Sequence, residues 1–502
     1  MLSKLRKNII ANYVSQLYAA GLGILILPVY IKYMGAESYG LVGFFTMLQA
    51  WFALLDLGLT PTIARETARY HGGSMSVLHY RQLFRALSSI FVGIAVIGGM
   101  ALWLLAEPVA YKWLQVETLS MSAVVVAVQI MAVSVALRWL GGLYRGVITG
   151  SERLVWLSGF NAIIATLRFP AVFITMWQFG FTPTVFFWHQ LAVAIVEVLG
   201  LYLMSNWLKP EIKKGDIIGW SIQPVKPVLK FALTIAFTSS VWVLVTQTDK
   251  LILSGILPLA EYGFFTLAVM VSSGIMLLSA PLSIVIQPRL TRLYAEGRNA
   301  EFYILYESGA KVISVFPFFI ALMIAFYPNH FLMLWTNDEV ISSKTSDILR
   351  FYVLGSGFLS LSAFPSILQN AYGKLKYHLI GNLIMLFLLV PLSAYFAREF
   401  GAIGSSLVWL FVNLFYLVVW VSYSHYKLIP GKALSWVVEG IVKPSLVLFL
   451  VLVLSKLLFS GTIFQSRLVI FVFFTMLTLS AYFAWYVFYG RRVISGFGRR
   501  SI

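Results

Sequence analysis

The chain has 502 residues, of which 60% are hydrophobic and only 11% are charged, and its mean hydropathy is +0.86. Because a soluble domain carries about 25% charged residues, this composition excludes an ordinary soluble protein. A net charge of +18 would favour nucleic acid as the partner of a soluble protein. In a membrane protein it indicates the positive-inside bias and contact with membrane lipids, so no nucleic acid partner is expected. The absence of cysteine excludes disulfides and thiolate chemistry.

Apolar segments follow one another along the whole chain. A helix of roughly 20 apolar residues crosses the ~30 Å hydrocarbon core of a bilayer. Fourteen segments are long enough, which predicts an all-α polytopic membrane protein with about 14 transmembrane helices. The predicted spans are residues 9–31, 40–60, 86–106, 118–138, 155–178, 184–205, 231–251, 263–287, 311–328, 348–370, 378–397, 402–423, 441–459 and 467–489.

The basic residues predict the orientation. With the N-terminus inside, most of the 37 lysines and arginines fall in cytoplasmic segments or at their helix ends. The opposite loops carry few basic residues and several acids, among them Glu37, Glu107 and Asp338. Both termini are therefore predicted to be cytoplasmic.

A sequence repeat divides the predicted spans. Ala36 to Gly40 (AESYG) opens span 2, and Ala260 to Gly263 (AEYG) opens span 8. The spacing from Gly40 to Arg65 agrees closely with the spacing from Gly263 to Arg289. Six spans separate the copies, so both enter the membrane from the same side, as in transporters built from two parallel repeats.

The repeat predicts a domain organisation with two pseudo-symmetric six-helix lobes. We expect an N-lobe over 1–205, a cytoplasmic linker over 206–230 and a C-lobe over 231–425. Residues 426–502 would add two C-terminal spans and a basic tail. In such transporters the lobes rock around a central cavity.

Motifs of catalysis and metal binding are missing. The chain contains no G-x-x-x-x-G-K-[ST] phosphate loop and no H-E-x-x-H zinc motif. The six histidines lie in predicted loops or near span ends, where they are expected to be interfacial or solvated. No predicted loop is long enough for a soluble catalytic domain. We therefore expect no enzyme activity, no metal site and no bound cofactor.

Ionisable residues inside the predicted spans are the candidate functional residues, because a charge at bilayer depth is costly and needs a cavity or a partner. Arg168 lies near the middle of span 5, and Glu197 lies near the middle of span 6, which the chain enters from the opposite side. Their long side chains could meet. A structural salt bridge and a role at the cavity are both open interpretations of this pair.

Three further ionisable residues lie within predicted spans. Asp249 and Lys250 are adjacent near the outer end of span 7. Neighbouring helical residues point in different directions, so one is expected to line the cavity and the other an interface. Asp56 lies in the inner third of span 2, where a hydrogen bond to a helix end near Pro61 is the plainer alternative to a functional role.

Several of these residues lie in motifs that resemble bacterial polysaccharide flippases of the multidrug/oligosaccharidyl-lipid/polysaccharide exporter superfamily. The resemblance rests on Tyr33 to Gly40, Leu55 to Gly58 and Ala64 to Glu66 in the first half. In the second half it rests on Thr248 to Leu253 followed by Ala260 to Gly263. It covers the first twelve spans. Many members have twelve spans, and peptidoglycan-precursor flippases have fourteen.

The resemblance implies a V-shaped cavity between two lobes in the inner membrane of a bacterium. It implies that the substrate is an undecaprenyl-diphosphate-linked oligosaccharide, flipped to the periplasmic leaflet for surface polysaccharide such as the O-antigen of lipopolysaccharide. Arg168 and Lys250 would bind the diphosphate, although cations inside the spans are few. Asp56, Glu197 and Asp249 would be the candidates for coupling to a proton or sodium gradient. A polysaccharide polymerase and a chain-length regulator would be candidate protein partners.

Two alternatives remain open at this stage. A cation-coupled exporter of amphipathic drugs or of another lipid-linked precursor would share the superfamily. A non-transporting component of a polysaccharide assembly complex belongs to a different class. A polymerase of that class would need a large periplasmic loop, but the longest predicted outer loop, about 329–347, is short.

Overall fold

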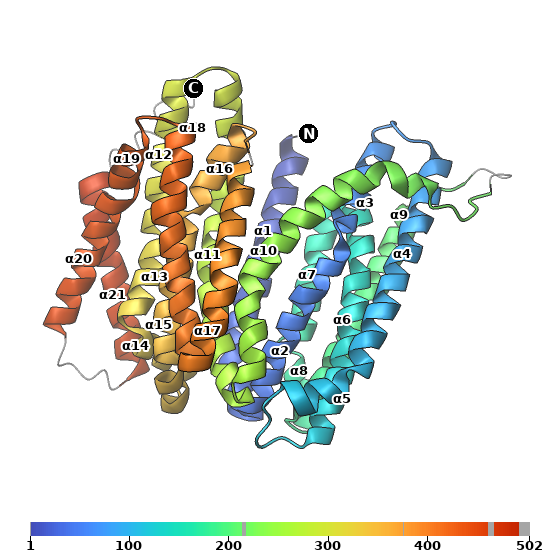
Figure 1. Ribbon diagram of the computed structural model, residues 1–502, viewed down its shortest axis with the longest axis horizontal. Helices are drawn as coiled ribbons and strands as arrows, with labels where there is room; N and C mark the ends of the chain where they lie inside the picture. The colour runs from blue at the N-terminus through green and yellow to red at the C-terminus, as the bar shows by residue number, and fades with distance from the viewer. Residues whose placement is uncertain (1, 213–216, 375, 460–465, 491–502) are drawn as a thin grey trace. The chain divides into compact units, whose positions relative to one another are not determined.

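The computed structural model describes the whole chain except residues 1, 213–216, 375, 460–465 and 491–502, so the predicted basic tail lies outside the described residues. The chain packs as two compact units, Met1–Gly263 and Phe264–Ile502. Helices dominate both units (Figure 1). This fits a chain that crosses a bilayer, where backbone groups find no water and must bond within the segment.

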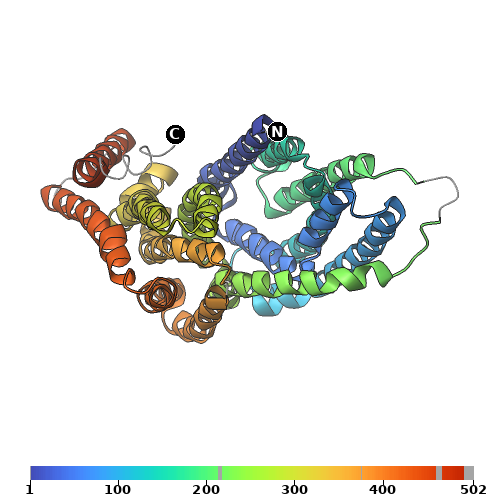
Figure 2. The ribbon, with the colours of Figure 1, turned by 90° about the horizontal axis from the view of Figure 1, so that it is seen from above.

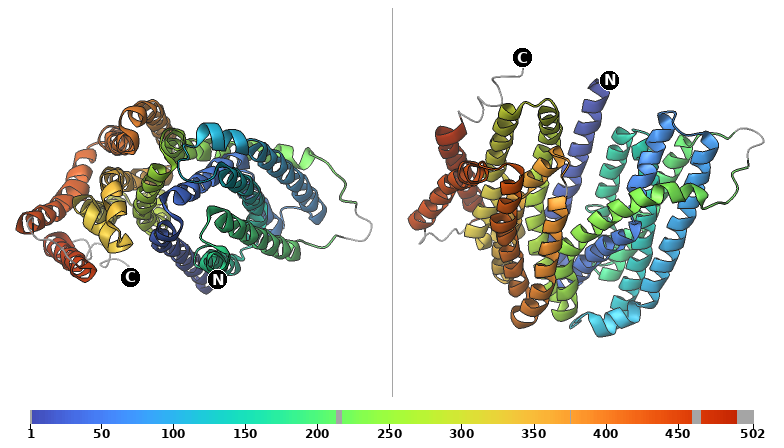
Figure 3. Two further views of the ribbon diagram at one scale, coloured as in Figure 1. Left: turned by 90° about the horizontal axis from the view of Figure 1, so that it is seen from below. Right: turned by 45° about the horizontal axis from the view of Figure 1, so that its top comes forward.

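The first unit contains the predicted spans 1 to 7. Its helices are α1 (Leu2–Met34), α2 (Ala36–Phe52), η1 (Ala53–Asp56), α3 (Leu59–His71), α4 (Val77–Leu104), α5 (Ala106–Pro108), η2 (Val109–Trp113), α6 (Met121–Gly150), α7 (Leu154–Arg168), α8 (Val172–Phe179), α9 (Pro183–Leu208), η3 (Gln223–Val225) and α10 (Lys226–Ile256). The side chains of Ser76, Ser120 and Thr182 cap the N-termini of α4, α6 and α9. Helix α10 crosses α2, η1 and α3 (Figure 3).

Helix α11 (Leu259–Ala295) begins in the first unit and continues into the second. The remaining helices are α12 (Asn299–Val315), α13 (Pro317–Phe326), α14 (Pro328–Thr336), α15 (Glu339–Leu361), α16 (Ala363–Ala371), α17 (Lys376–Phe415), η4 (Tyr416–Val421), α18 (Ser422–Leu428), α19 (Ala433–Ser435), η5 (Trp436–Val442), α20 (Lys443–Leu458), α21 (Arg467–Trp485) and η6 (Tyr486–Gly490). Helices α20 and α21 lie at the edge of this unit, against α13 and α14 (Figure 2).

The number of membrane crossings agrees with the sequence prediction. The described residues contain 13 helical segments that are long and apolar enough to span a membrane. One of them, Lys376–Leu428, has 53 residues and is too long for a single crossing. The chain reverses at Gly401, whose φ is 58°, and the Trp420 indole N–H donates to the Tyr377 carbonyl at 2.9 Å. This segment therefore holds two antiparallel crossings, which gives fourteen.

One prediction about the histidines is wrong. His425 is fully buried, not interfacial or solvated. Its Nε2 lies 2.8 Å from the Tyr306 hydroxyl, and its ring stacks on Trp436 at a centroid distance of 4.1 Å. The hydrogen bond and the stacked ring replace the solvent that the sequence interpretation assumed.

The two Tyr-Gly motifs of the repeat contact each other reciprocally within the first unit. A Cβ atom on Gly40 would overlap the carbonyl oxygen of Leu259, and one on Gly263 would lie 2.6 Å from the carbonyl oxygen of Ala36. In each case the glycine meets the carbonyl four residues before the other glycine. This symmetric contact lets the start of α2 and the start of α11 approach at backbone distance. The repeat therefore has a structural counterpart at these two turns.

A buried carboxylate fixes the start of α2 in the same region. Glu37 accepts hydrogen bonds from the backbone N–H groups of Glu117, Thr118 and Leu119, at 2.6 to 3.2 Å, and from the Thr118 hydroxyl. These donors precede α6 and would otherwise lack partners, so Glu37 ties the loop before α6 to α2. The corresponding residue of the second motif, Glu261, is exposed.

Candidate functional site

Three arginines and one glutamate form a polar cluster inside the first unit. Glu197 on α9 is buried and pairs with Arg145 of α6 and, at 2.6 Å, with Arg168 at the end of α7. Arg138 lies two turns before Arg145 on the same helix, which is ~10 Å along the axis. Arg138 and Arg145 therefore lie along one face of α6, and Arg168 joins them from α7.

Uncharged polar side chains hold these arginines in place. Gln49 of α2 accepts from Arg138, and Gln190 of α9 accepts from the other terminal nitrogen of Arg138 at 3.0 Å. The Gln190 amide in turn donates to the Arg168 carbonyl at 3.0 Å. Asn161 of α7 accepts from Arg145 at 2.8 Å. Partners of this kind fix the rotamers of long side chains and so preorganise the cluster.

The cluster carries surplus positive charge. Three guanidinium groups against one carboxylate leave a net charge of +2, that is 3 − 1. The side chains of Arg145 and Arg168 keep 33% and 23% of their surface exposed, so they are reachable by a ligand. A cavity of about 410 Å³ borders Arg138, between α6 and the α2–α3 bend, and Asp56 lines the same cavity. An arginine-rich, partly open site favours an anion with several oxygen acceptors.

The structure confirms one part of the sequence interpretation and corrects another. Arg168 and Glu197 do meet, as their depths predicted. The expectation that cations inside the spans are few is wrong, because Arg138 and Arg145 join them. The predicted span 118–138 ended at Arg138, whereas α6 continues to Gly150. The sequence signal that could have shown the longer helix is the mostly apolar stretch after Arg138, which continues the helical pattern.

Asp249 and Lys250 lie elsewhere, on α10. The Lys250 ammonium lies 3.4 Å from the Asp249 carboxylate and also donates to the Thr246 carbonyl. Asp249 is buried, and the Lys250 side chain is only 13% exposed. The two residues therefore interact with each other, although their directions on a helix differ. Whether Lys250 contacts a substrate stays a prediction.

Asp56 is engaged at a break between helices. It accepts from the Thr60 backbone N–H at 3.2 Å and from the Thr60 hydroxyl at 2.5 Å. Leu57 and Gly58, with φ of 48° and 69°, turn the chain between η1 and α3. A Cβ atom on Gly58 would overlap the Ala232 carbonyl of α10, so only glycine fits this bend. This geometry matches the helix-end alternative for Asp56.

We expect Asp56→Asn to retain transport, because an amide oxygen still accepts the Thr60 hydrogen bonds. Asp56→Ala removes this acceptor and is expected to lower the free energy of unfolding by about 1 kcal/mol. Thermal unfolding of the purified variants and an in-cell transport assay would measure both effects. A stable but inactive Asp56→Asn protein would contradict the helix-end role and point to an ionisable one.

The fold is similar to those of two solved membrane transporters. The lipid II flippase MurJ, in an inward closed conformation, is similar with a TM-score of 0.76 and 14% identity, covering 97% of this chain and 99% of that chain. An inward-facing multidrug resistance MATE family transporter of the MOP superfamily is similar with a TM-score of 0.67 and 14% identity, covering 82% of this chain and 94% of that one. At such identities the likeness concerns the fold.

Residues 5–294 match the family described as "Polysaccharide biosynthesis protein", and the chain belongs to this family. A Shigella flexneri protein described as "Putative O-antigen transporter" is 21% identical over 423 residues, 80% of this chain and 94% of its own length. An uncharacterized membrane protein of Methanocaldococcus jannaschii is 22% identical over 428 residues, 81% of this chain and 95% of its own length. The sequence match thus shows a polysaccharide biosynthesis family, and the fold is shared with a lipid II flippase and with a MATE transporter of the MOP superfamily.

Proposed function

We propose that this protein flips an undecaprenyl-diphosphate-linked oligosaccharide from the cytoplasmic to the periplasmic leaflet of a bacterial inner membrane by alternating access. The flipped oligosaccharide would serve the biosynthesis of surface polysaccharide of the O-antigen type. The observation that carries the proposal is the cluster of Arg138, Arg145, Arg168 and Glu197, which lies on helices long and apolar enough to span a membrane.

The charge of the cluster supports this substrate over a cationic drug. A diphosphate esterified at both ends carries one negative charge on each phosphate, which the net +2 of the cluster balances. Planar guanidinium groups can each pair two phosphate oxygens. A cationic drug would meet repulsion at the same place, which disfavours the drug exporter among the alternatives.

Coupling to a proton or sodium gradient belongs to the proposal as a prediction. Of its three candidate carboxylates, Asp56 bonds a helix end and Glu197 balances two guanidinium groups. Asp249 is buried and pairs with Lys250 at 3.4 Å, so all three carboxylates are engaged in this structure and all three stay candidates for an ion carrier.

Ligand-induced stabilisation of the purified protein tests the substrate class. We expect undecaprenyl-diphosphate-linked sugar to raise the thermal midpoint, since a ligand at 100 times its Kd adds about 2.7 kcal/mol to the native state. Undecaprenyl monophosphate should have a smaller effect, because it presents fewer oxygens to the arginines. Stabilisation by a quaternary ammonium drug, with none from the diphosphate, would replace this proposal with the drug exporter.

The orientation can be tested with single cysteines, since the chain has none of its own. We expect Asp338→Cys to react with a membrane-impermeant maleimide added to intact spheroplasts. Arg298→Cys should react only after the membrane is opened. Both results follow from the distribution of the basic residues. Labelling of position 298 from outside would reverse the topology and with it the proposed direction of transport.

A further inference from the structure

The face of α4 that carries Val92, Val96 and Met100 is more exposed than the corresponding face of α12 and α13 in the second half of the chain. Helix α4, Val77–Leu104, and the segment Asn299–Phe326, made of α12 and α13, have 28 residues each. Their starting positions are separated in the sequence by almost the same distance as Gly40 and Gly263. They are therefore corresponding spans of the repeat.

Packing inside each unit supports this register. A Cβ atom on Gly99 of α4 would lie 2.9 Å from the Ala136 Cβ of α6. A Cβ atom on Gly357 of α15 would lie 2.9 Å from the Ala321 Cβ of α13. Gly99 corresponds to Ala321 at the same sequence offset as the two helix starts, and Ala136 corresponds to Gly357 at nearly that offset. Each pair thus marks the same close approach of two helices, with glycine and alanine exchanged.

In the second unit this face is covered by the chain itself. The Ser314 hydroxyl donates to the Gly440 carbonyl of η5 at 2.8 Å, and the rings of Phe326 and Phe449 meet edge to face at 5.5 Å. Phe318 and Leu322, which lie between them on the same row, are 6% and 7% exposed. The span formed by η5 and α20 therefore packs along this row.

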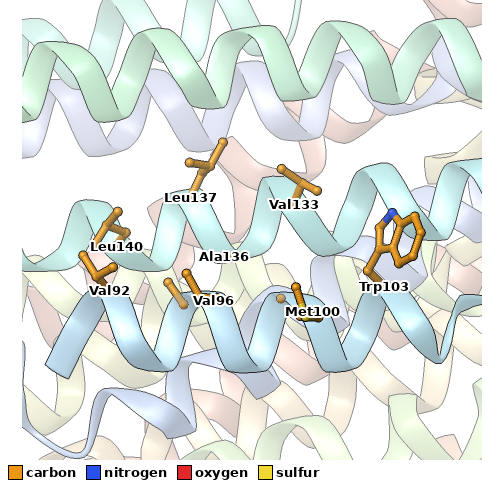
Figure 4. Close-up of a pocket in the computed structure, with 10 residues that line it drawn as sticks. Val92, Val96, Met100, Trp103, Val133, Ala136, Leu137 and Leu140 are labelled. Carbon is orange, nitrogen blue, oxygen red and sulfur yellow. The ribbon is translucent and has the colours of Figure 1, made fainter. Parts of the chain in front are cut away.

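In the first unit no helix packs on the corresponding row of α4 among the described residues, and its side chains are exposed. Val92, Val96, Met100 and Leu104 follow one another every fourth residue, and Val96 and Met100 are 55% and 59% exposed. With residues of α6 such as Leu137, most of this row lines an apolar groove of about 340 Å³ (Figure 4). Nothing in the described part of the first unit takes the place that η5 and α20 take in the second.

We propose that the groove between α4 and α6 binds a transmembrane helix of a second membrane protein. Lipid could cover this face in either unit, but in the second unit a helical span, η5 and α20, covers it. We therefore expect a helix rather than lipid on the face of α4. The partner helix should be apolar and carry glycine or serine in its contact row, as η5 and α20 carry Gly440 and Ser445. Small residues let helices approach closely in a bilayer, where packing drives association. A second copy of this chain fits less well, because it would oppose two rows of bulky side chains.

Site-specific photocrosslinking in the native host tests this inference. A photoreactive amino acid at Val96 or Met100 is expected to give one crosslinked membrane protein, several-fold above the yield at Leu25. Leu25 on α1 is a matched control because it is 68% exposed and apolar. The same amino acid at Phe318 is the positive control and should crosslink within the chain to α20.

Support requires identification of the crosslinked peptide by mass spectrometry. The peptide should lie in a membrane span with glycine or serine in the contact row, and a probe in that span should crosslink back to α4. Adducts with lipid only, crosslinks between two copies of this chain, or equal yields at Leu25 and Val96 would each overturn the proposal. Val96, Met100 and Leu25 are exposed whereas Phe318 is buried, so transport by each variant is measured to check that the protein is native.

Discussion

Arg168→Ala is expected to abolish complementation of surface polysaccharide while the protein remains in the membrane. A hydrogen bond to a charged group contributes about 1.5–3 kcal/mol, so losing the guanidinium should weaken substrate binding about tenfold to hundredfold. Arg168→Lys keeps the charge but loses the planar fork, and should be partly active. Arg145→Ala should resemble Arg168→Ala, because both arginines pair with Glu197 in the same cluster. Arg350→Ala, which removes an exposed arginine paired with Asp347, is the matched control and should be near neutral.

The double variant Arg168→Ala/Glu197→Ala separates substrate binding from a structural salt bridge. In the single variant Arg145 still pairs with Glu197, so the carboxylate is not left buried alone. If Arg168 binds substrate, the double variant should stay inactive at wild-type protein levels. Recovery of polysaccharide in the double variant would show that Arg168 serves only to balance Glu197, and the binding role would be withdrawn.

Gly40→Ala is expected to lower the thermal stability of the purified protein and to reduce transport. The added Cβ overlaps the Leu259 carbonyl, and a backbone atom cannot rotate away as the end of a side chain can. Overpacking of this kind costs about 1–3 kcal/mol. Gly263→Ala should have a similar effect through the Ala36 carbonyl, 2.6 Å from its Cβ. Fluorescence-detected thermal unfolding in detergent would measure both.

Gly21→Ala is the matched control, because a Cβ atom there would have no neighbour within 4 Å. It should be neutral or stabilising by up to about 1 kcal/mol, the helix-propensity difference between alanine and glycine. The double variant of Gly40 and Gly263 should cost less than the sum of the single variants, since both glycines serve one contact. Equal stability of Gly40→Ala and Gly21→Ala would contradict the reciprocal contact.

The sequence alone determined the class of this protein, the number of crossings and the paired Tyr-Gly motifs. Hydropathy acts on consecutive residues, so a run such as 184–205 specifies a membrane helix wherever it packs. The contact between Arg168 and Glu197 was also predictable, since each lies near the middle of one of two neighbouring predicted spans. The full cluster was not predicted, because treating Arg138 as a span end placed Arg145 in a loop.

Tertiary structure decided which of the intramembrane charges share a site. Arg138 bonds Gln49 of α2 and Gln190 of α9, both far from it in the sequence, and no local pattern specifies such pairs. Tertiary structure also decided that Asp56 accepts hydrogen bonds from Thr60. It further decided that Glu37 of the first motif is buried, whereas Glu261 of the second motif is exposed. The physical reason is the same in each case. Hydropathy and helix propensity depend on near neighbours, whereas the partner of a buried polar group depends on how distant helices pack.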